Sequence, residues 1–414
     1  MKLDLSYVRA QFPAFLVPGL ADRAFFENAG GSYACAPVID RLTRFYRERK
    51  VQPYAPYAAA QAGGAEMDEA RARLAAMMGV RTQELSFGPS TTANTYVLSQ
   101  AVRRWLAPGE AIVVTDQDHE ANSGPWRRLA EEGVEVREWK INPASGHLDP
   151  GRLAPLLADG RVRLVCFPHC SNVVAEINPV AEIVALAHAA GAAACVDGVS
   201  YAPHGLPDVG GLGADIYLFS AYKTYGPHQG IMAIRESLGM RLPNQGHWFN
   251  ADTLWKRFTP AGPDHAQVAA SAGIADYFDA LHDHHFGAEP DPLRRAGRVH
   301  DLMRAHEVAL CQPLLDYLRD RNDLRLVGPA EAERRAPTVA VDLGRPAEPV
   351  SAALASEGIN CWAGDFYAGR PLSAMGIDPK RGVLRLSMVH YTSAADVSRL
   401  ISALDRVLRQ NKPD

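Results

Sequence analysis

The sequence predicts an α/β protein whose helices cover both faces of a mostly parallel sheet. Three observations support this fold class. Between residues 25 and 258, apolar segments alternate with polar loops and helical patterns. The apolar segments, such as residues 163–167 and 192–196, are unbroken runs, which is typical of strands buried on both faces. The helical pattern of residues 180–191 lies between these two runs and completes a strand–helix–strand unit.

Each further element has a local reason, since apolar runs predict strands and a period of about 3.6 residues predicts a helix. The first part of the chain is predicted to hold a helix at residues 96–106 and strands at residues 111–114, 163–167, 192–196 and 215–219. The later part is predicted to hold helices at residues 266–281 and 291–318 and strands at residues 324–327 and 338–341.

The length of 414 residues allows a large domain and a smaller one. Residues 20–265 are predicted to form the large domain, and residues 1–19 and 288–414 a smaller α/β domain. Residues 266–287 are predicted to form the connecting helix. Its last residues, 282–285 (HDHH), are predicted to form a solvated turn, because adjacent histidines suit a turn better than a metal site. No metal site is therefore predicted.

Composition indicates which kinds of binding partner are expected for this protein. The formal net charge is −4 and no basic tract is present, which argues against nucleic acid. No apolar run is long enough to span a bilayer, and the chain does not start with a charged-then-apolar secretion signal. Six scattered cysteines show no zinc-type spacing. We therefore expect a small-molecule substrate, no membrane partner and a cytoplasmic location.

Lys223 is the first candidate catalytic residue. It is the one lysine in the aromatic, small-residue segment 219–228 (FSAYKTYGPH). An amine in an apolar pocket has a lowered pKa, which supplies the free amine that an imine requires. A solvated loop lysine would be the ordinary alternative.

Asp197 stands 26 residues earlier, at the end of an apolar strand, and the strand of residues 215–219 lies between it and Lys223. Both side chains are expected to face one crevice beyond the strand ends, where open α/β sheets bind ligands. A buried carboxylate opposite an imine-forming lysine is the constellation of a pyridoxal phosphate enzyme, in which the acid keeps the pyridine nitrogen protonated. A helix N-cap or a structural ion pair is the alternative for Asp197.

The phosphate of such a cofactor needs donors. Residues 87–94 (FGPSTTAN) place Thr91 and Thr92 before the helical pattern of residues 96–106. Backbone amides at a helix start and threonine hydroxyls form an anion site, although the same pattern is common in ordinary caps.

Two further strand-end loops carry side chains that suit a planar ring. His119 follows the strand of residues 111–114, where an imidazole can lie over the ring. Asn172 follows the strand of residues 163–167 and is able to bond the phenolic oxygen of the cofactor. Most loop histidines are solvated, so His119 alone would not indicate a cofactor site.

Together these residues resemble class V aminotransferases, and within that class the cysteine desulfurase-like group. The resemblance runs from residues 26–31 to residues 382–387 and rests on Thr91-Thr92, DHEAN at residues 118–122, Ser171-Asn172, VDGVSYAPH at residues 196–204 and SAYKTYGPH at residues 220–228. It implies a fold type I transferase that uses pyridoxal 5'-phosphate. It also implies a mostly parallel seven-stranded sheet in the large domain, a smaller C-terminal α/β domain, and a homodimer.

The resemblance also implies a role for each matching residue. Lys223 would be the Schiff-base residue and His119 the catalytic group on the ring face, while Arg385 would clamp the substrate carboxylate bidentately. The residues implied to bind the cofactor are Thr91, Thr92, His119, Asn172, Asp197, Ser200, Ser220, Tyr222 and Lys223. The residues expected at the substrate are Asn28, Ala29, Gly30, Tyr367 and Arg385.

The sequence departs from the group in several places. Ser200 stands where desulfurases have a glutamine, and Tyr222 where many have a histidine. Residues 261–265 (AGPDH) lack the threonine that related dimers bring to the partner's phosphate. Above all, Tyr367 stands near the position of the cysteine whose thiolate attacks the substrate's sulfur. The nearby Cys361 is expected to be a packing residue, so true cysteine desulfurase activity is not expected.

The predicted function is that of a pyridoxal phosphate-dependent enzyme acting on an amino acid or a cysteine S-conjugate. The favoured reaction is C–S β-lysis through an external aldimine and a quinonoid, partly because relatives without the loop thiol do such work in secondary metabolite biosynthesis. The alternatives are an aminotransferase, a decarboxylation-coupled oxidative deaminase, an epimerase, a true desulfurase, or a non-catalytic pyridoxal-binding protein. The sequence does not separate the enzymatic alternatives, because they share one electron sink.

Overall fold

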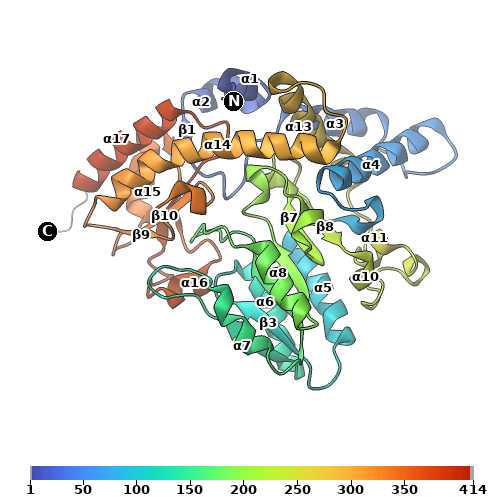
Figure 1. Cartoon of the computed structure of the whole chain (residues 1–414). Coiled ribbons are helices and arrows are strands. Elements are labelled where there is room, and N and C mark those ends of the chain that lie inside the picture. Colours follow the sequence, from blue (N-terminus) through green and yellow to red (C-terminus); the bar gives the residue numbers. More distant parts are fainter. Residues whose placement is uncertain (1, 411–414) are drawn as a thin grey trace.

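A seven-stranded sheet lies at the centre of the large part of the protein (Figure 1). In this computed structural model, residues 2–410 are described. The strand order is β2-β8-β7-β6-β5-β3-β4, and β8 runs antiparallel to both neighbours while the other pairs are parallel. The strands are β2 (Leu85–Gly88), β3 (Ala111–Thr115), β4 (Glu135–Trp139), β5 (Val162–Pro168), β6 (Ala193–Asp197), β7 (Ile216–Ser220) and β8 (Gly230–Ile234). This sheet confirms the predicted mostly parallel seven-stranded arrangement.

Helices bury both faces of this sheet. Ile112 of β3 packs in one core with Val102 of α5 (Thr91–Trp105) and with residues of α6 (Glu120–Arg127). Its neighbour Val113 packs in another core with Ile183 of α8 (Val180–Ala189). All five residues of β3 are buried, so the unbroken apolar run reflects burial on both faces.

A helical layer covers one end of the large sheet. It consists of α3 (Ala36–Glu48), α4 (Ala58–Met77), α12 (His265–Ala270) and α13 (Ala272–His285), which pack against one another. The long helix α14 (Pro292–Arg319) packs against α4 and α13 and continues to α17 (Ala394–Gln410) (Figure 1). It therefore ties the large sheet to the C-terminal part of the chain.

The histidine-rich corner differs from its prediction. Residues 282–285 are the last turn of α13 rather than a solvated turn. His282 is fully buried, and His284 stacks on Tyr7 with ring centroids 3.7 Å apart. The prediction of a solvated turn was wrong for the backbone, which is helical, and for the buried His282, whereas Asp283 and His284 are exposed beside the N-terminal helix α1 (Leu5–Ala10). Among residues 2–410, no group of three or more histidine, cysteine or acidic side chains is placed to hold a metal ion.

The C-terminal part forms a smaller α/β unit. Its antiparallel sheet has the order β12-β13-β10-β9, with β9 (Arg325–Val327), β10 (Thr338–Asp342), β12 (Trp362–Gly364) and β13 (Val383–Ser387). Helices α14, α15 (Glu348–Ser356) and α17 enclose its core. Strand β1 (Ala24–Phe25) joins this unit by pairing with β11 (Ile359–Asn360). The remaining short helices are α2 (Pro18–Ala21), α7 (Ala154–Leu157), α9 (Val209–Leu212), α10 (Glu236–Gly239), α11 (Leu254–Arg257) and α16 (Gly369–Ala374).

The N-terminal helix α1 contacts both units. Val8 lies in the core shared with the large sheet, while Arg9 forms an ion pair with Asp396 of α17. The boundaries predicted for the two domains stay a prediction.

The sheet topology gathers four loops at one edge. The parallel strands β3, β5, β6 and β7 end at Thr115, Pro168, Asp197 and Ser220. Because parallel strands point the same way, the loops that follow them meet outside their carboxyl ends. This edge faces the smaller C-terminal unit.

Candidate active site

A cavity of about 290 Å³ lies at this edge of the sheet. All nine residues predicted to bind the cofactor line it: Thr91, Thr92, His119, Asn172, Asp197, Ser200, Ser220, Tyr222 and Lys223. They come from five separate segments of the chain, and the topology brings them to one place.

The start of helix α5 forms one wall of the cavity. Ser90 caps the helix by accepting a hydrogen bond from the Ala93 backbone amide at 3.1 Å. The hydroxyls of Thr91 and Ser220 are hydrogen-bonded at 2.8 Å. Gly230 allows the close approach of β8, because an added Cβ would lie 2.6 Å from the Thr91 nitrogen. A helix N-terminus with adjacent hydroxyls is suited to an anion such as phosphate.

Lys223 and Asp197 are both buried in this cavity. Burial, aided by the charge of Arg385 and opposed by Asp197 and Glu27, lowers the pKa of Lys223 to about 8. Burial raises the pKa of Asp197 to about 6, opposed by the Val199 backbone amide, which donates to Asp197 Oδ1 at 2.8 Å, and by Lys223. A substantial fraction of Lys223 is therefore a free amine near neutral pH, while Asp197 is ionised.

His119 is a neutral imidazole at the start of helix α6. Its Nδ1 accepts a hydrogen bond from the Ala121 backbone amide at 3.0 Å, so its proton lies on Nε2. Burial, aided by the charges of Lys223 and Arg385, lowers the pKa of His119 to about 3. The ring is held in one tautomer and does not take up a proton near neutral pH.

Asn172 carries an unsatisfied acceptor in the cavity. Its Nδ2 donates to the Phe366 carbonyl at 2.9 Å, whereas its buried Oδ1 has no hydrogen-bond partner. An unpaired buried acceptor costs about 1–3 kcal/mol, so a bound donor such as a ring hydroxyl would relieve it.

Arg385 lies beside the cavity, on strand β13, and is buried. Its Nη2 donates to Glu27 Oε1 at 2.7 Å, and its guanidinium lies 3.7 Å from the centre of the Phe366 ring. Sequence reasoning did not foresee Glu27 as the partner, because the two residues are 358 positions apart. The Asn172 carbonyl is 3.5 Å from Nη1.

The other predicted substrate residues lie nearby but do not line the cavity. Asn28 donates to the Ser387 carbonyl at 2.9 Å and accepts from the Tyr391 hydroxyl, so its side chain is committed to the fold. The backbone amide of Ala29 donates to Ser387 Oγ at 2.9 Å, and that of Gly30 to the Glu27 carbonyl at 3.0 Å. Their place in substrate binding stays a prediction.

Tyr367 is 72% exposed, and its ring centre lies 5.5 Å from that of His119. The carbonyl of Tyr367 accepts a hydrogen bond from the Glu120 amide at 2.8 Å. The loop that carries it is therefore fixed at the mouth of the site.

Six residues that line the cavity were not predicted from the sequence: Ser90, Ala121, Pro168, Cys170, Val199 and His228. His228 stacks on Tyr222 with ring centres 4.8 Å apart. Cys170 also lines the cavity, but its thiol donates to the Ala175 carbonyl, and burial raises its pKa to about 12. The sequence signal for His228 was its place in the segment 220–228, and for Cys170 its place directly before Ser171-Asn172.

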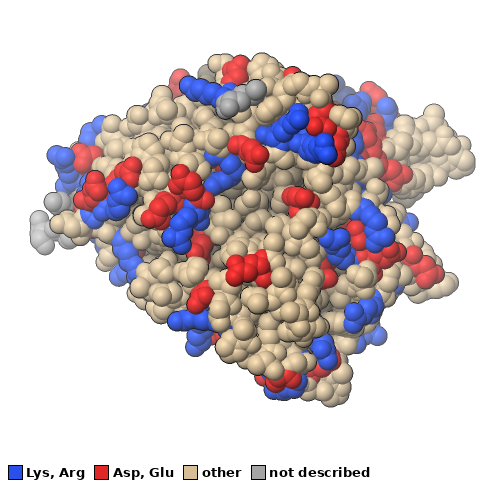
Figure 2. All heavy atoms as spheres, viewed as in Figure 1, with Lys and Arg blue, Asp and Glu red and all other residues tan. Residues whose placement is uncertain are grey.

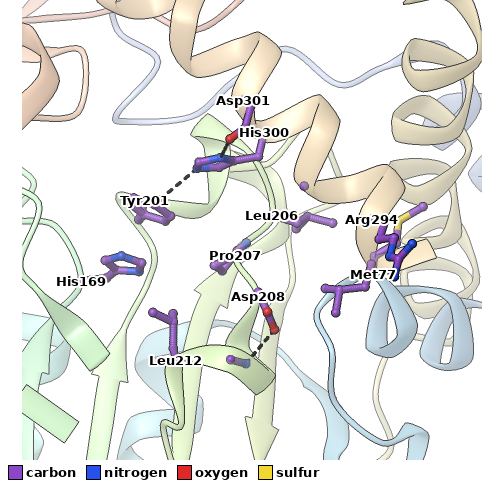
Figure 3. Close-up of a pocket in the computed structure, with 13 residues that line it drawn as sticks. Met77, His169, Tyr201, Leu206, Pro207, Asp208, Leu212, Arg294, His300 and Asp301 are labelled. Carbon is purple, nitrogen blue, oxygen red and sulfur yellow. Dashed lines mark hydrogen bonds and ion pairs between the residues drawn. The ribbon is translucent and has the colours of Figure 1, made fainter. Parts of the chain in front are cut away.

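A second cavity, of about 650 Å³, lies between helix α14 and the segment that follows β6 (Figure 3). Its polar groups are paired with one another: the Tyr201 hydroxyl lies 3.0 Å from His300 Nε2, and His300 Nδ1 lies 3.2 Å from Asp301. Asp208 accepts from the Gly211 amide at 2.7 Å. No lysine lines this cavity, so the smaller cavity around Lys223 is the better candidate for catalysis.

Comparisons with known proteins define the class. Residues 24–248 and 298–400 match the family model "Aminotransferase class-V". The chain is 33% identical to the aminotransferase-like protein FGM3 of Gibberella zeae, with 98% of each chain covered. It is 31% identical to a cysteine desulfurase of Serratia proteamaculans, with 98% of this chain and 99% of that protein covered. The protein belongs to the class V aminotransferase family.

Solved structures share the fold. A cysteine desulfurase from Thermococcus onnurineus superposes with a TM-score of 0.84 at 21% identity, covering 99% of each chain. The cysteine desulfurase CsdA of Escherichia coli gives a TM-score of 0.81 at 24% identity, covering 99% of this chain and 100% of that one. These neighbours confirm fold type I and the resemblance seen in the sequence. The protein is a pyridoxal 5'-phosphate-dependent enzyme of the cysteine desulfurase-like type.

The cavity fits this cofactor. The lysine amine, the opposing acid, the helix start with its hydroxyls and the unsatisfied Asn172 oxygen match the aldehyde, ring nitrogen, phosphate and ring hydroxyl of pyridoxal phosphate.

Proposed function

We propose that this enzyme cleaves cysteine S-conjugates by C–S β-lysis. One observation carries the proposal: the residues suited to amino acid chemistry share one cavity, but no reactive thiol reaches it. Burial raises the pKa of Cys170 and of Cys361 to about 12, and the mouth of the site carries Tyr367 instead. A desulfurase needs a thiolate to accept sulfur, whereas elimination of a thiol does not.

In this proposal the start of α5 with Thr91, Thr92 and Ser220 holds the phosphate. Tyr222 and Ser200 complete the cofactor's surroundings, His119 packs on the ring, and Asn172 Oδ1 accepts a hydrogen bond from the ring hydroxyl. Asp197 holds the proton of the pyridine nitrogen. The bound cofactor supplies an electron sink that weakens the bonds at the α-carbon of an attached amino acid.

Arg385 orients the substrate through its α-carboxylate, and the loop of Tyr367 limits access of water. The Lys223 amine removes the α-proton, for which its lowered pKa suits it. The C–S bond then breaks with its electron pair on sulfur, which leaves as a thiolate and takes up a proton. With one water consumed, the overall products are a thiol, pyruvate and ammonia.

We also propose that the enzyme is a cytoplasmic homodimer that acts on a small molecule. The exposed aromatic side chains of Tyr54, Tyr57, Trp248 and Phe249 support association, since aromatic residues are enriched at interfaces. Figure 2 shows charges of both signs interspersed over the visible face, with no basic field for nucleic acid. No helix within residues 2–410 is long and apolar enough to cross a membrane, and the six cysteines are free thiols. Sedimentation analysis tests the dimer.

The activity is tested by incubating the holoenzyme with cysteine and a panel of S-substituted cysteines, with mass spectrometry of every product. Equal amounts of thiol and pyruvate support C–S β-lysis. Accumulation of the pyridoxamine form would assign transamination instead, and an aldehyde with carbon dioxide would assign decarboxylation-coupled oxidation. Alanine and a protein-bound persulfide from cysteine would assign desulfuration.

A further inference from the structure

The side-chain carboxylate of Glu27 contacts Arg385, the arginine beside the active site. Glu27 follows strand β1, and its backbone bridges Ser387 at the end of β13, two residues beyond Arg385. The side chain of Arg385 is 3% exposed and that of Glu27 is 18% exposed. The pair therefore lies under the surface, with one side of Glu27 still reaching water.

The same carboxylate lies within the electrostatic field of Lys223. Burial raises the pKa of Glu27, while the charges of Arg385 and Lys223 oppose the rise. Glu27 in turn opposes the lowering of the pKa of Lys223. A carboxylate that interacts with both cations occupies the region where the α-carboxylate of an amino acid substrate beside Lys223 would bind.

The contact between Glu27 and Arg385 is a single-point ion pair. Only Oε1 of Glu27 meets the guanidinium, while the buried Oε2 and the buried Arg385 Nε have no hydrogen-bond partner. Paired, parallel hydrogen bonds between arginine and a carboxylate are stronger than one such bond. A ligand carboxylate that binds Arg385 through two oxygens can therefore replace Glu27.

The surroundings allow this exchange with little rearrangement. The backbone of Glu27 is held by the bridge to Ser387, so the side chain alone needs to move. Gly30 permits the present position of the Glu27 carboxylate, because an added Cβ there would lie 2.5 Å from Glu27 Oε1. The Phe366 ring, 3.7 Å from the guanidinium, keeps Arg385 in place.

We propose that Glu27 is a specificity-determining residue that competes with the substrate carboxylate for Arg385. A ligand carboxylate must displace Glu27 before it can bind Arg385. A ligand that has only a carboxylate therefore binds weakly. A substrate that also binds through another group is favoured. This inference rests on the proposed role of Arg385 in orienting the substrate. It does not depend on which bond the enzyme breaks afterwards.

The test measures binding of propionate and of uncharged propionamide to the holoenzyme by calorimetry, since neither has an amine to react. Glu27→Gln keeps the shape and removes the charge. It is expected to tighten propionate binding about tenfold, or 1.4 kcal/mol, and to leave propionamide within about twofold. Glu27→Gln should still bind the cofactor as an imine with Lys223, which shows that the site is intact, and the lost charge should only lower the pKa at that position.

The control is Glu357→Gln, which removes an equal charge from a surface ion pair with Arg406 and is expected to change neither ligand. In an Arg385→Gln background, Glu27→Gln should no longer affect propionate. Unchanged or weaker propionate binding in Glu27→Gln, or an equal change for propionamide, would overturn the inference. If Arg385→Gln did not weaken propionate binding, Arg385 would not be the residue that binds the substrate carboxylate. Failure to release thiols from cysteine conjugates would affect only the proposed reaction.

Discussion

The side-chain amide of Asn172 donates a hydrogen bond to the backbone carbonyl of Phe366 at 2.9 Å. This bond joins the loop after β5 to the loop between β12 and α16, across the mouth of the active site. The Glu120 amide makes a second bond to the Tyr367 carbonyl at 2.8 Å. Phe366 and Tyr367 have φ values of 54° and 55°, a region that side chains disfavour, so the two bonds hold a strained loop closed.

Replacing Asn172 with alanine should therefore open this loop. Loss of one hydrogen bond of about 1 kcal/mol raises the open population about fivefold. Chymotrypsin cleavage between Tyr367 and Ala368, measured on the holoenzyme at saturating cofactor, should rise by a similar factor. Asn360→Ala, which removes a surface amide next to β12, should not change the cleavage rate. An unchanged rate in Asn172→Ala would show that the loop is held by its other contacts.

Much of the cofactor cavity could be predicted because sheet topology alone determines where strand-end loops meet. Asp197 ends β6, and Ser220 ends β7 just before Lys223, so buried apolar runs located them without any view of the fold. His119 and Asn172 follow β3 and β5 in the same way. The positions of these four residues follow from the local pattern of apolar strands and polar loops, which is visible in the sequence.

Contacts made by distant segments could not be predicted in this way. Glu27 and Arg385 meet because β1 joins the C-terminal unit through β11, and no local pattern marks that pairing. His282 was expected in a solvated turn because adjacent histidines suit a turn better than a metal site, yet helix packing buries it. Both the Glu27–Arg385 contact and the burial of His282 depend on the packing of segments that are distant in the sequence, which local composition does not reveal.

His119 is expected to have two separable roles, capping α6 and packing on the cofactor ring. Asparagine is also a good N-cap, so His119→Asn should keep the melting temperature near that of the native enzyme, while His119→Ala should lose about 1 kcal/mol of stability. Both variants should lose about tenfold or more in turnover, because both lack the ring. Thermal unfolding and product formation measure the two effects. Full activity in His119→Asn would mean that the cap alone matters.

Cofactor loading should depend on pH through Lys223. Imine formation needs the neutral amine, and the lowered pKa of about 8 means that the neutral fraction rises as the pH increases through 8. The loading rate of the apoenzyme, followed by visible absorbance, should therefore rise about tenfold per pH unit below 8 and level off above it. An ordinary lysine would keep rising to about pH 10.5. Lys223→Ala should develop no imine absorbance at any pH, whereas the exposed Lys140→Ala should behave as the native enzyme does.

Turnover of cysteine conjugates should not require any thiol of the protein. Burial raises the pKa of Cys361 to about 12, so at pH 8 only about one molecule in ten thousand carries its thiolate. Cys361→Ser should keep thiol release within about twofold of the native rate, because elimination leaves sulfur on the product. The same holds for brief iodoacetamide treatment of the folded holoenzyme. If Cys361→Ser instead abolished sulfur release from cysteine and left a persulfide undetectable, Cys361 would be a sulfur acceptor and the enzyme a desulfurase with a displaced thiol.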